Sequence, residues 1–330
     1  MNALLLDQAH HGFTLRQSRT ALPEPGAGEI RVRIMAAALN PVDAKLAIGG
    51  HTAWTYPHIL GVDGAGVVDA LGAGVERFAV GERVLAHFPL SRPGTLAQYA
   101  LVAAHAASRV PESVDWATAA SLPCAALTAW QALTRKLRLQ SGQTILIEAA
   151  AGGVGGFAVQ MAKHLGLTVI ATCSTAKHAY VHSLGADHVI DYRNHDVAQT
   201  VGRITEGRGV HGVLDAIGGA TAQRDLGLLG YGGAMACLIN LPDTTHINVF
   251  RVAPSLHFIT LGGAWLSGSL DAQADLARMG DEVLALLTSG AIRALPIKRL
   301  PFEAEAVTAA LHEQLAGQVS GKQVVEIASA

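Results

Sequence analysis

The sequence predicts an α/β protein in which a doubly wound parallel sheet is accompanied by a second, β-rich domain. Residues 144–147 are short, apolar and β-branched, and a glycine turn and an amphipathic helical pattern follow at once, as in a parallel strand that leads into a helix. Strand and helix patterns then alternate to about residue 261, whereas the first 120 residues contain many short strand patterns between Gly and Pro turns. A length of 330 residues suits two domains.

Composition and charge argue against several classes of function. A formal net charge of −2 offers no electrostatic basis for binding nucleic acid or an anionic membrane. No apolar run approaches the roughly 20 residues that span a bilayer, and the first residues lack the basic and apolar regions of a signal peptide. The three cysteines are too scattered for a disulfide framework. We therefore expect a cytoplasmic protein without a nucleic-acid or membrane partner.

The β-rich part comes first along the chain. Alternation of polar and apolar residues predicts strands at 29–36, 65–72, 78–86 and 96–102, which together suggest a compact barrel-like domain. An alanine-rich helical region follows at 116–136 and is interrupted by Pro123.

From residue 143 the pattern becomes one of six strands, with helices between most of them. The predicted strands are 144–147, 167–172, 188–191, 213–217, 234–239 and 257–261. The predicted helices between them begin near residues 154, 176, 197 and 222, and the tail adds helices near 273–289 and 303–316 and a last strand at 323–327. This order predicts a doubly wound parallel sheet.

The glycine turn is the first candidate binding site. Gly152, Gly153, Val154 and Gly155 lead from the strand into the helix, so bare backbone N–H groups and the positive helix end face an anion. We interpret the turn as a site for the pyrophosphate of a dinucleotide; the alternative is an ordinary turn of small residues. In the G-x-G-x-x-G pattern, Ala150 takes the place of the first glycine.

The end of the second parallel strand indicates which dinucleotide binds. An NAD enzyme usually offers an acidic residue there to the ribose 2′-hydroxyl, but residues 171–177 contain no acid. Ser174 can hydrogen-bond a 2′-phosphate and Lys177 can neutralise it, which favours NADPH. Alternatively, Ser174 or Thr175 caps the next helix and Lys177 is a solvated side chain.

Several segments in this order resemble the medium-chain dehydrogenase/reductase superfamily, specifically its zinc-free quinone oxidoreductase branch. The matching segments are N-P-V-D-A-K at 40–45, P-H-I-L-G-V-D-G-A-G-V-V at 57–68, V-G-E-R-V at 80–84, the helix around 122–129 and A-A-A-G-G-V-G at 149–155. The resemblance implies a Rossmann domain at 121–266 and a GroES-like β-barrel domain made of 1–120 and 267–330. It also implies an active-site cleft between them and a homodimer in which the strand near Phe258 pairs across a two-fold axis.

The resemblance also assigns further cofactor contacts. It places Tyr192 against the 2′-phosphate of NADPH, Thr128 near the nicotinamide, Ile217 under the ribose and Leu241 beside the nicotinamide. It places Lys322, in the returning Gly-Lys pair, close to the phosphates; the alternative is a surface lysine before a strand.

The zinc ligands of related alcohol dehydrogenases are missing from the sequence. Pro41, Val42 and Asp43 stand where the first ligand cysteine is expected, and Val62 stands at the histidine position. Only Cys124 lies near a ligand position, and one ligand cannot build a zinc site. We therefore expect no metal, and we interpret Cys124 as a packing residue, with a reactive thiol as the alternative.

A reductase without zinc can transfer hydride to an acceptor that is already electron-poor, such as a quinone or an α,β-unsaturated carbonyl. Asn40 is the candidate donor to the acceptor oxygen, or else stabilises a turn. Asp43 is a candidate for proton relay, or else binds nearby backbone or Lys45. Trp54 and Tyr56 are expected to overhang the substrate. The alternatives in function are an alcohol dehydrogenase-like enzyme and a non-catalytic NADPH-binding sensor.

Overall fold

The computed structural model describes residues 1–245, 247–317 and 319–327, and these form two compact units. The first contains Met1–Leu127, Leu261–Thr288 and the chain from Pro296; the second contains Thr128–Thr260 and Ser289–Leu295. The sequence-based division at 120/121 and 266/267 does not include this return of the chain to the second unit. Gln160 holds the returning segment, since its amide accepts from the backbone N–H of Arg293 at 2.9 Å and donates to the carbonyl of Arg293 at 3.2 Å.

The second unit is built on a six-stranded parallel sheet with the order β11-β10-β9-β12-β13-β14. This confirms the predicted doubly wound sheet, in which the first two crossovers run one way from β9 and the later ones run the other way. The strands are β9 Thr144–Ile147, β10 Thr168–Cys173, β11 His188–Asp191, β12 Val210–Asp215, β13 Leu229–Cys237 and β14 Ser255–Phe258. The last strand begins and ends earlier than predicted because its four residues pair with residues 234–237 of β13.

Helices connect these strands and complete the core of the unit. They are the second half of α3 Pro123–Trp130, the π-helical turn η2 Gln131–Leu137, α4 Gly153–His164, the 3₁₀ turn η3 Thr175–Lys177, α5 His178–Ser183, α6 Val197–Ile204, α7 Gly219–Leu226 and α8 Val249–Val252. Apolar side chains of the sheet, such as Leu146, Ile170 and Met235, are fully buried. Burial on both faces explains why these strands are continuously apolar in the sequence.

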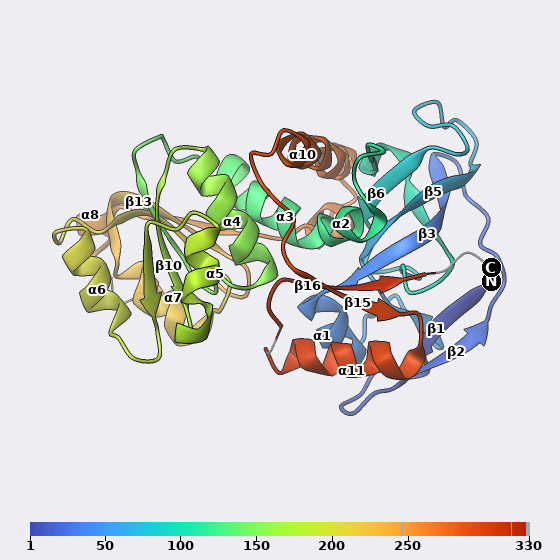
Figure 1. Cartoon of the computed structure of the whole chain (residues 1–330), viewed down its shortest axis with the longest axis horizontal. Coiled ribbons are helices and arrows are strands. Elements are labelled where there is room, and N and C mark those ends of the chain that lie inside the picture. The colour runs from blue at the N-terminus through green and yellow to red at the C-terminus, as the bar shows by residue number, and fades with distance from the viewer. Residues whose placement is uncertain (246, 318, 328–330) are drawn as a thin grey trace. The chain divides into compact units, whose positions relative to one another are not determined.

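The first unit is β-rich and contains strands from both ends of the chain. A three-stranded sheet has the order β2-β1-β4, and a larger sheet has the order β15-β16-β3-β5-β6-β8, with β7 also paired to β3. Figure 1 shows the C-terminal strands β16 and β15 beside β3. The strands are β1 Asn2–Leu6, β2 Leu15–Arg19, β3 Glu29–Leu39, β4 His58–Ile59, β5 Asp63–Leu71, β6 Arg83–His87, β7 Tyr99–Ala103, β8 Ser108–Arg109, β15 Ile297–Pro301 and β16 Lys322–Glu326. This confirms the GroES-like β domain completed by the C-terminal segment.

Helices of different lengths pack on these sheets. They are α1 Pro41–Gly49, the 3₁₀ turn η1 Ala104–Ala106, α2 Trp116–Ser121, the start of α3, α9 Gly262–Leu266, α10 Leu270–Thr288 and α11 Ala304–Leu315. The predicted break at Pro123 lies where α2 ends and α3 begins. Among the described residues, no helix is both long enough and apolar enough to cross a bilayer.

Gly155 should be far less tolerant of a side chain than another helical glycine of the same unit. A Cβ at Gly155 would lie 2.4 Å from the carbonyl oxygen of Ala149 and 2.7 Å from Cα of Ala150, both backbone atoms. We expect Gly155→Ala to lower the free energy of unfolding by ~1–3 kcal/mol, the range for overpacking. Gly202→Ala in α6 is the control: its Cβ meets nothing within 4 Å, so we expect a gain of ~0.5–1 kcal/mol. Urea unfolding of both variants measures the difference, and equal effects would contradict the close approach at Gly155.

Candidate functional site

A chain of buried polar side chains joins three segments of the first unit. β3 lies between β5 and β16, with Ala38 opposite Asp63 on one side and Leu39 opposite Gln323 on the other. This register places Asn40, Asp63 and Lys322 together although they are far apart in the sequence. All three side chains are almost completely buried.

The amide of Asn40 connects the other two side chains. Nζ of Lys322 donates to its Oδ1 at 2.5 Å, and its Nδ2 donates to Oδ2 of Asp63 at 2.9 Å. The ammonium lies 3.8 Å from the same carboxylate oxygen. Oδ1 of Asp63 accepts from the backbone N–H of Cys124 at 2.8 Å, which ties α3 to β5.

This arrangement bears on two of the predicted roles. The structure brings Lys322 to Asn40, whereas the resemblance placed it near the cofactor phosphates. Asn40 gives its amide oxygen and one N–H to neighbouring side chains, so its proposed hydrogen bond to a substrate oxygen remains a prediction and needs the second N–H, which lies 3.4 Å from the carbonyl of Ala38.

Asp43 accepts hydrogen bonds from two backbone segments next to this group of buried polar side chains. Its Oδ2 accepts from the N–H of Asn40 at 2.8 Å and its Oδ1 accepts from the N–H of Val62 at 3.1 Å. These bonds match the predicted alternative in which the carboxylate binds nearby backbone. Lys45, the other partner considered, is exposed. Asp43 therefore fixes the turn after β3 against the segment before β5.

Burial shifts the protonation of this region toward neutral groups. It raises the pKa of Asp43 to about 7, with the nearby carboxylate of Asp63 adding to the effect. Burial also raises the pKa of Asp63 to about 6, although Lys322 and Asn40 oppose the shift. Burial lowers the pKa of His87 to about 4 and raises the pKa of the Cys124 thiol. A raised thiol pKa supports the packing role of Cys124 rather than a reactive thiolate.

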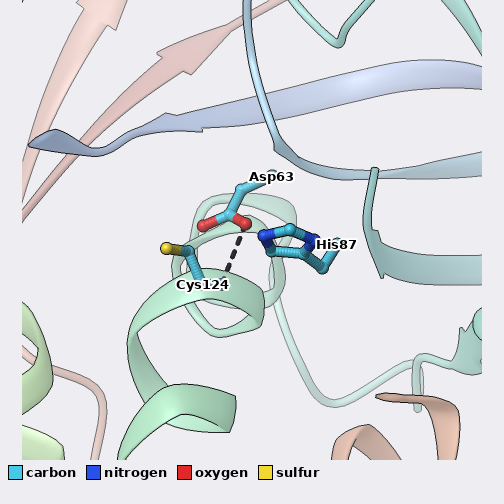
Figure 2. A group of neighbouring side chains, drawn as sticks. All are labelled: Asp63, His87 and Cys124. Carbon is cyan, nitrogen blue, oxygen red and sulfur yellow. Dashed lines mark hydrogen bonds between the residues drawn. The ribbon is translucent and has the colours of Figure 1, made fainter. Parts of the chain in front are cut away.

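The side chains of Asp63, His87 and Cys124 lie close together, with the carboxylate of Asp63 between the imidazole of His87 and the thiol of Cys124 (Figure 2). One potential ligand atom from each lies within 4.8 Å of the others. His87, at the end of β6, was not singled out by the sequence, because nothing in V-L-A-H-F marks this histidine as turned toward Asp63. The indole N–H of Trp265 lies 3.3 Å from Nδ1 of His87 and can only donate, so the neutral ring carries its hydrogen on Nε2.

In the second unit, the glycine turn has the features that an anion site requires. Gly152 precedes α4, whose first residue is Gly153, so the helix begins in the predicted turn and Val154 and Gly155 lie in its first turn. Ala149 has a positive φ of 52°. Its backbone N–H donates to Oγ1 of Thr172 at 3.3 Å, and the N–H of Ala150 donates to the carbonyl of Thr172 at 3.0 Å. The turn is thus tied to the end of β10.

A network of ionic side chains that the sequence did not indicate lies next to the turn. Its members are Glu148, Arg224 and Asp225. Oε2 of Glu148 accepts from Thr172 at 2.5 Å, and Arg224 of α7 pairs with Glu148 and Asp225. Burial raises the pKa of Glu148 and of Asp225. The arginine balances carboxylates that would otherwise oppose an anion at the turn.

The end of β10 carries the predicted hydroxyl and cation. Ser174 makes no capping hydrogen bond, and the side chain of Lys177 has no hydrogen bond or ion pair to the described residues, so both polar groups are available to a ligand. Tyr192 is 50% exposed, and the guanidinium of Arg193 lies 5.7 Å from its ring centre. Arg193 was not predicted, and it adds a second cation.

An acidic residue nevertheless lies near this strand end. Asp191, the last residue of β11, accepts from Oγ1 of Thr175, and its other partners are the N–H of Arg193 at 3.0 Å and the amide of Asn194 at 2.6 Å. These hydrogen bonds, with that from Thr175 the largest, lower the pKa of Asp191 to about 2. The carboxylate is therefore ionised, but its oxygens are occupied by the protein.

The remaining predicted contacts differ in exposure. Ile217 and Leu241, which follow β12 and β13, are 50% and 46% exposed, and Thr128 in α3 is buried. Trp54 lines a cavity of about 380 Å³ in the first unit, stacks on His58 at 3.9 Å and donates its indole N–H to the carbonyl of Leu90. Tyr56 is 40% exposed and lies edge-on to Trp54. Internal packing thus accounts for part of the role of Trp54.

Comparisons with known proteins bear on both units. Residues 26–112 match the alcohol dehydrogenase GroES-like domain, and residues 153–283 match the zinc-binding dehydrogenase family. The chain is 35% identical to the quinone oxidoreductase of Pseudomonas aeruginosa over 277 residues, which are 82% of this chain and 83% of that relative.

Two further relatives are connected with polyketide synthesis or enoyl reduction. The chain is 34% identical over 276 residues to the polyketide synthase GfsB of Streptomyces halstedii, a match that covers 82% of this chain but only 5% of that much longer protein. The crystal structure of the CurK enoyl reductase superposes with a TM-score of 0.87 at 27% identity and covers 98% of this chain and 99% of that one.

One of the matching families is named for zinc binding, so we ask whether the cluster of Asp63, His87 and Cys124 could hold a zinc ion. Asp63, His87 and Cys124 are suitable in type, but both oxygens of Asp63 already accept hydrogen bonds from Cys124 and Asn40. An ammonium, Nζ of Lys322, lies 3.8 Å from the carboxylate. The cluster as folded does not fit a zinc ion.

The buried carboxyl of Asp43 should leave a mark on the pH dependence of stability. Its pKa lies near 3.8 in the unfolded chain and at about 7 in the folded one, so the folded state holds more protons between these pH values and its stability falls as pH rises. Asp43→Asn removes this titration. We expect the difference in unfolding free energy, wild type minus variant, to fall by roughly 2–4 kcal/mol between about pH 4 and pH 7.5.

Urea unfolding across this pH range measures the difference. The control is Asp281→Asn on the exposed face of α10, which is expected to follow the wild type. A constant difference between wild type and the Asp43 variant would contradict the role assigned to burial.

Proposed function

This chain belongs to the medium-chain dehydrogenase/reductase superfamily, and from that premise we propose that it is a zinc-independent reductase that transfers hydride from NADPH to a quinone or an α,β-unsaturated carbonyl. The chain is an NAD(P)-dependent oxidoreductase similar to quinone oxidoreductases and enoyl reductases. The observation that carries the proposal is the glycine turn at the start of α4, held by Thr172 and backed by a neutralised ionic network.

The residues of the second unit bind and orient the cofactor in this proposal. The turn at 152–155 holds the pyrophosphate with backbone N–H groups, and Ser174, Lys177 and Tyr192, joined by Arg193, receive the 2′-phosphate. Thr128, Ile217 and Leu241 contact the nicotinamide and its ribose. When bound, NADPH supplies the hydride.

The chemistry of the first unit supports the proposed class of hydride acceptor. The cation of its buried polar cluster is an ammonium, which cannot coordinate and polarise an alcohol as a metal does. A quinone or enone already withdraws electrons, so hydride can add to it while hydrogen bonds stabilise the negative charge that develops on oxygen. We propose that the second N–H of Asn40 makes such a bond, and that Trp54 and Tyr56 contact the flat substrate.

A panel of substrates tests the function. We expect NADPH oxidation with quinones such as 9,10-phenanthrenequinone or with enones, little oxidation of simple alcohols, and no loss of activity after dialysis against a chelator. Alcohol oxidation that a chelator abolishes would support the alcohol dehydrogenase-like alternative. Tight NADPH binding without turnover of any quinone, enone or aldehyde would support a non-catalytic sensor.

Lys177 should determine much of the preference for NADPH. We expect Lys177→Ala to lower kcat/KM for NADPH by about tenfold, the effect of one charge-assisted contact, and to leave kcat/KM for NADH nearly unchanged. Arg208→Ala is the control, because Arg208 is an exposed cation of the same unit whose partner is Glu206. Steady-state kinetics with both cofactors provide the measurement, and an equal loss with NADPH and NADH would remove Lys177 from the 2′-phosphate site.

We also propose that the chain forms a homodimer through β14. This strand is the last in the order of the six-stranded sheet, and its Phe258 side chain is 46% exposed. Free strand edges are commonly covered by a second copy. Light scattering that finds only monomers over a range of concentrations would contradict this proposal.

A further inference from the structure

Three side chains of types that bind transition metals meet in the first unit but have no part in the proposed hydride transfer. Asp63 begins β5, His87 ends β6 and Cys124 lies in the first turn of α3 (Figure 2). A carboxylate, an imidazole and a thiol are ligand types of three-ligand sites that hold a catalytic metal and leave one position open, and here one potential ligand atom of each lies within 4.8 Å of the others. Among the described residues, it is the one such group with potential ligand atoms this close together.

The ammonium of Lys322 already occupies the position of a cation beside the carboxylate of Asp63. Lys322 is 3% exposed, its ammonium donates to Asn40 at 2.5 Å, and it lies 3.8 Å from Oδ2 of Asp63. An ammonium is a compact point charge, and a divalent ion bound to the same carboxylate would be held a few ångströms from it. Repulsion between like charges is strong at this range away from water.

The hydrogen bonds of His87 and Cys124 also oppose metal binding. The indole of Trp265 donates to Nδ1 of His87, so the hydrogen of the neutral ring occupies Nε2, and a nitrogen that carries a hydrogen cannot ligate. Cys124 directs its backbone N–H to Oδ1 of Asp63 at 2.8 Å, so this carboxylate oxygen already accepts a hydrogen bond that a bound metal would have to displace.

We propose that the ammonium of Lys322 is the permanent cation of this cluster, and that it excludes a divalent metal from Asp63, His87 and Cys124. The chain therefore carries a latent site for a borderline-soft transition metal, of the zinc or cobalt(II) class, which opens when the charge of Lys322 is removed. The inference concerns metal binding alone, so it stands or falls independently of the hydride acceptor.

Cobalt(II) binding tests the proposal, because a cobalt–thiolate bond produces a charge-transfer absorption that the free ion lacks. The purified chain and its Lys322→Met and Lys322→Arg variants are titrated with cobalt(II) chloride and followed by absorption spectroscopy. We expect the charge-transfer band in Lys322→Met and its absence in the wild type and in Lys322→Arg, which retains the charge. The affinity of the methionine variant should exceed that of the wild type by at least ~100-fold.

The choice of ligands is tested in the same background. Adding Cys124→Ser to Lys322→Met should abolish the charge-transfer band, and adding Cys173→Ser, at a buried cysteine of the other unit, should leave it intact. A thiolate band in the wild type would overturn the proposal, and so would a folded Lys322→Met variant that binds no cobalt.

Removing a buried cation can also unfold the chain. Further variants are therefore prepared in case Lys322→Met does not fold. Lys322→Gln retains a donor for Asn40 and replaces the methionine variant if that variant does not fold. If neither folds, Lys322→Met is combined with Asp63→Asn, which neutralises both members of the pair. Recovery of a folded protein, seen by circular dichroism, would support Lys322 as the counter-cation of Asp63, and failure to recover would overturn it.

Discussion

The buried ion pair of Lys322 and Asp63, bridged by Asn40, is the constraint on which the first unit depends. Lys322 lies at the start of β16, Asp63 at the start of β5 and Asn40 directly after β3, so each hydrogen bond joins segments distant in the sequence. Taking a carboxylate and an ammonium out of water is costly, and leaving one of them without its partner typically costs 3–5 kcal/mol. The strand pairing and the polar cluster therefore stabilise each other, and the C-terminal strand becomes part of the N-terminal domain.

Buried carboxylates in the second unit likewise need a positively charged partner. There Arg224 balances the buried carboxylates of Asp225 and of Glu148, which directly precedes the glycine turn. The hydrogen bond from Thr172 to Glu148 transmits this order to the turn, because Thr172 also accepts the N–H groups of Ala149 and Ala150. The backbone of the glycine turn is thus held in place by side chains that lie outside the turn.

Asn40 and Asp43 illustrate how a motif can be recognised before its physical role is known. The N-P-V-D-A-K segment pointed to the family. In the structure, the side chains of Asn40 and Asp43 both make hydrogen bonds inside the protein. Asp43 holds two backbone N–H groups, and Asn40 links an acid to a base. These demands on geometry explain why an amide and a carboxylate are needed there, whether or not either group also meets the substrate.

The sequence by itself determined the alternation of strands and helices after residue 143, the doubly wound sheet and the glycine turn, because these follow from local periodicity and from glycines at short spacing. It also showed that the usual zinc ligands are absent. Only the tertiary structure decided that Lys322 meets Asn40 and Asp63, that His87 turns toward Asp63, that Arg224 pairs with Glu148 beside the glycine turn and that Arg193 lies against Tyr192. Most of these contacts join residues far apart in the chain, whose meeting depends on strand register and helix packing rather than on any local pattern.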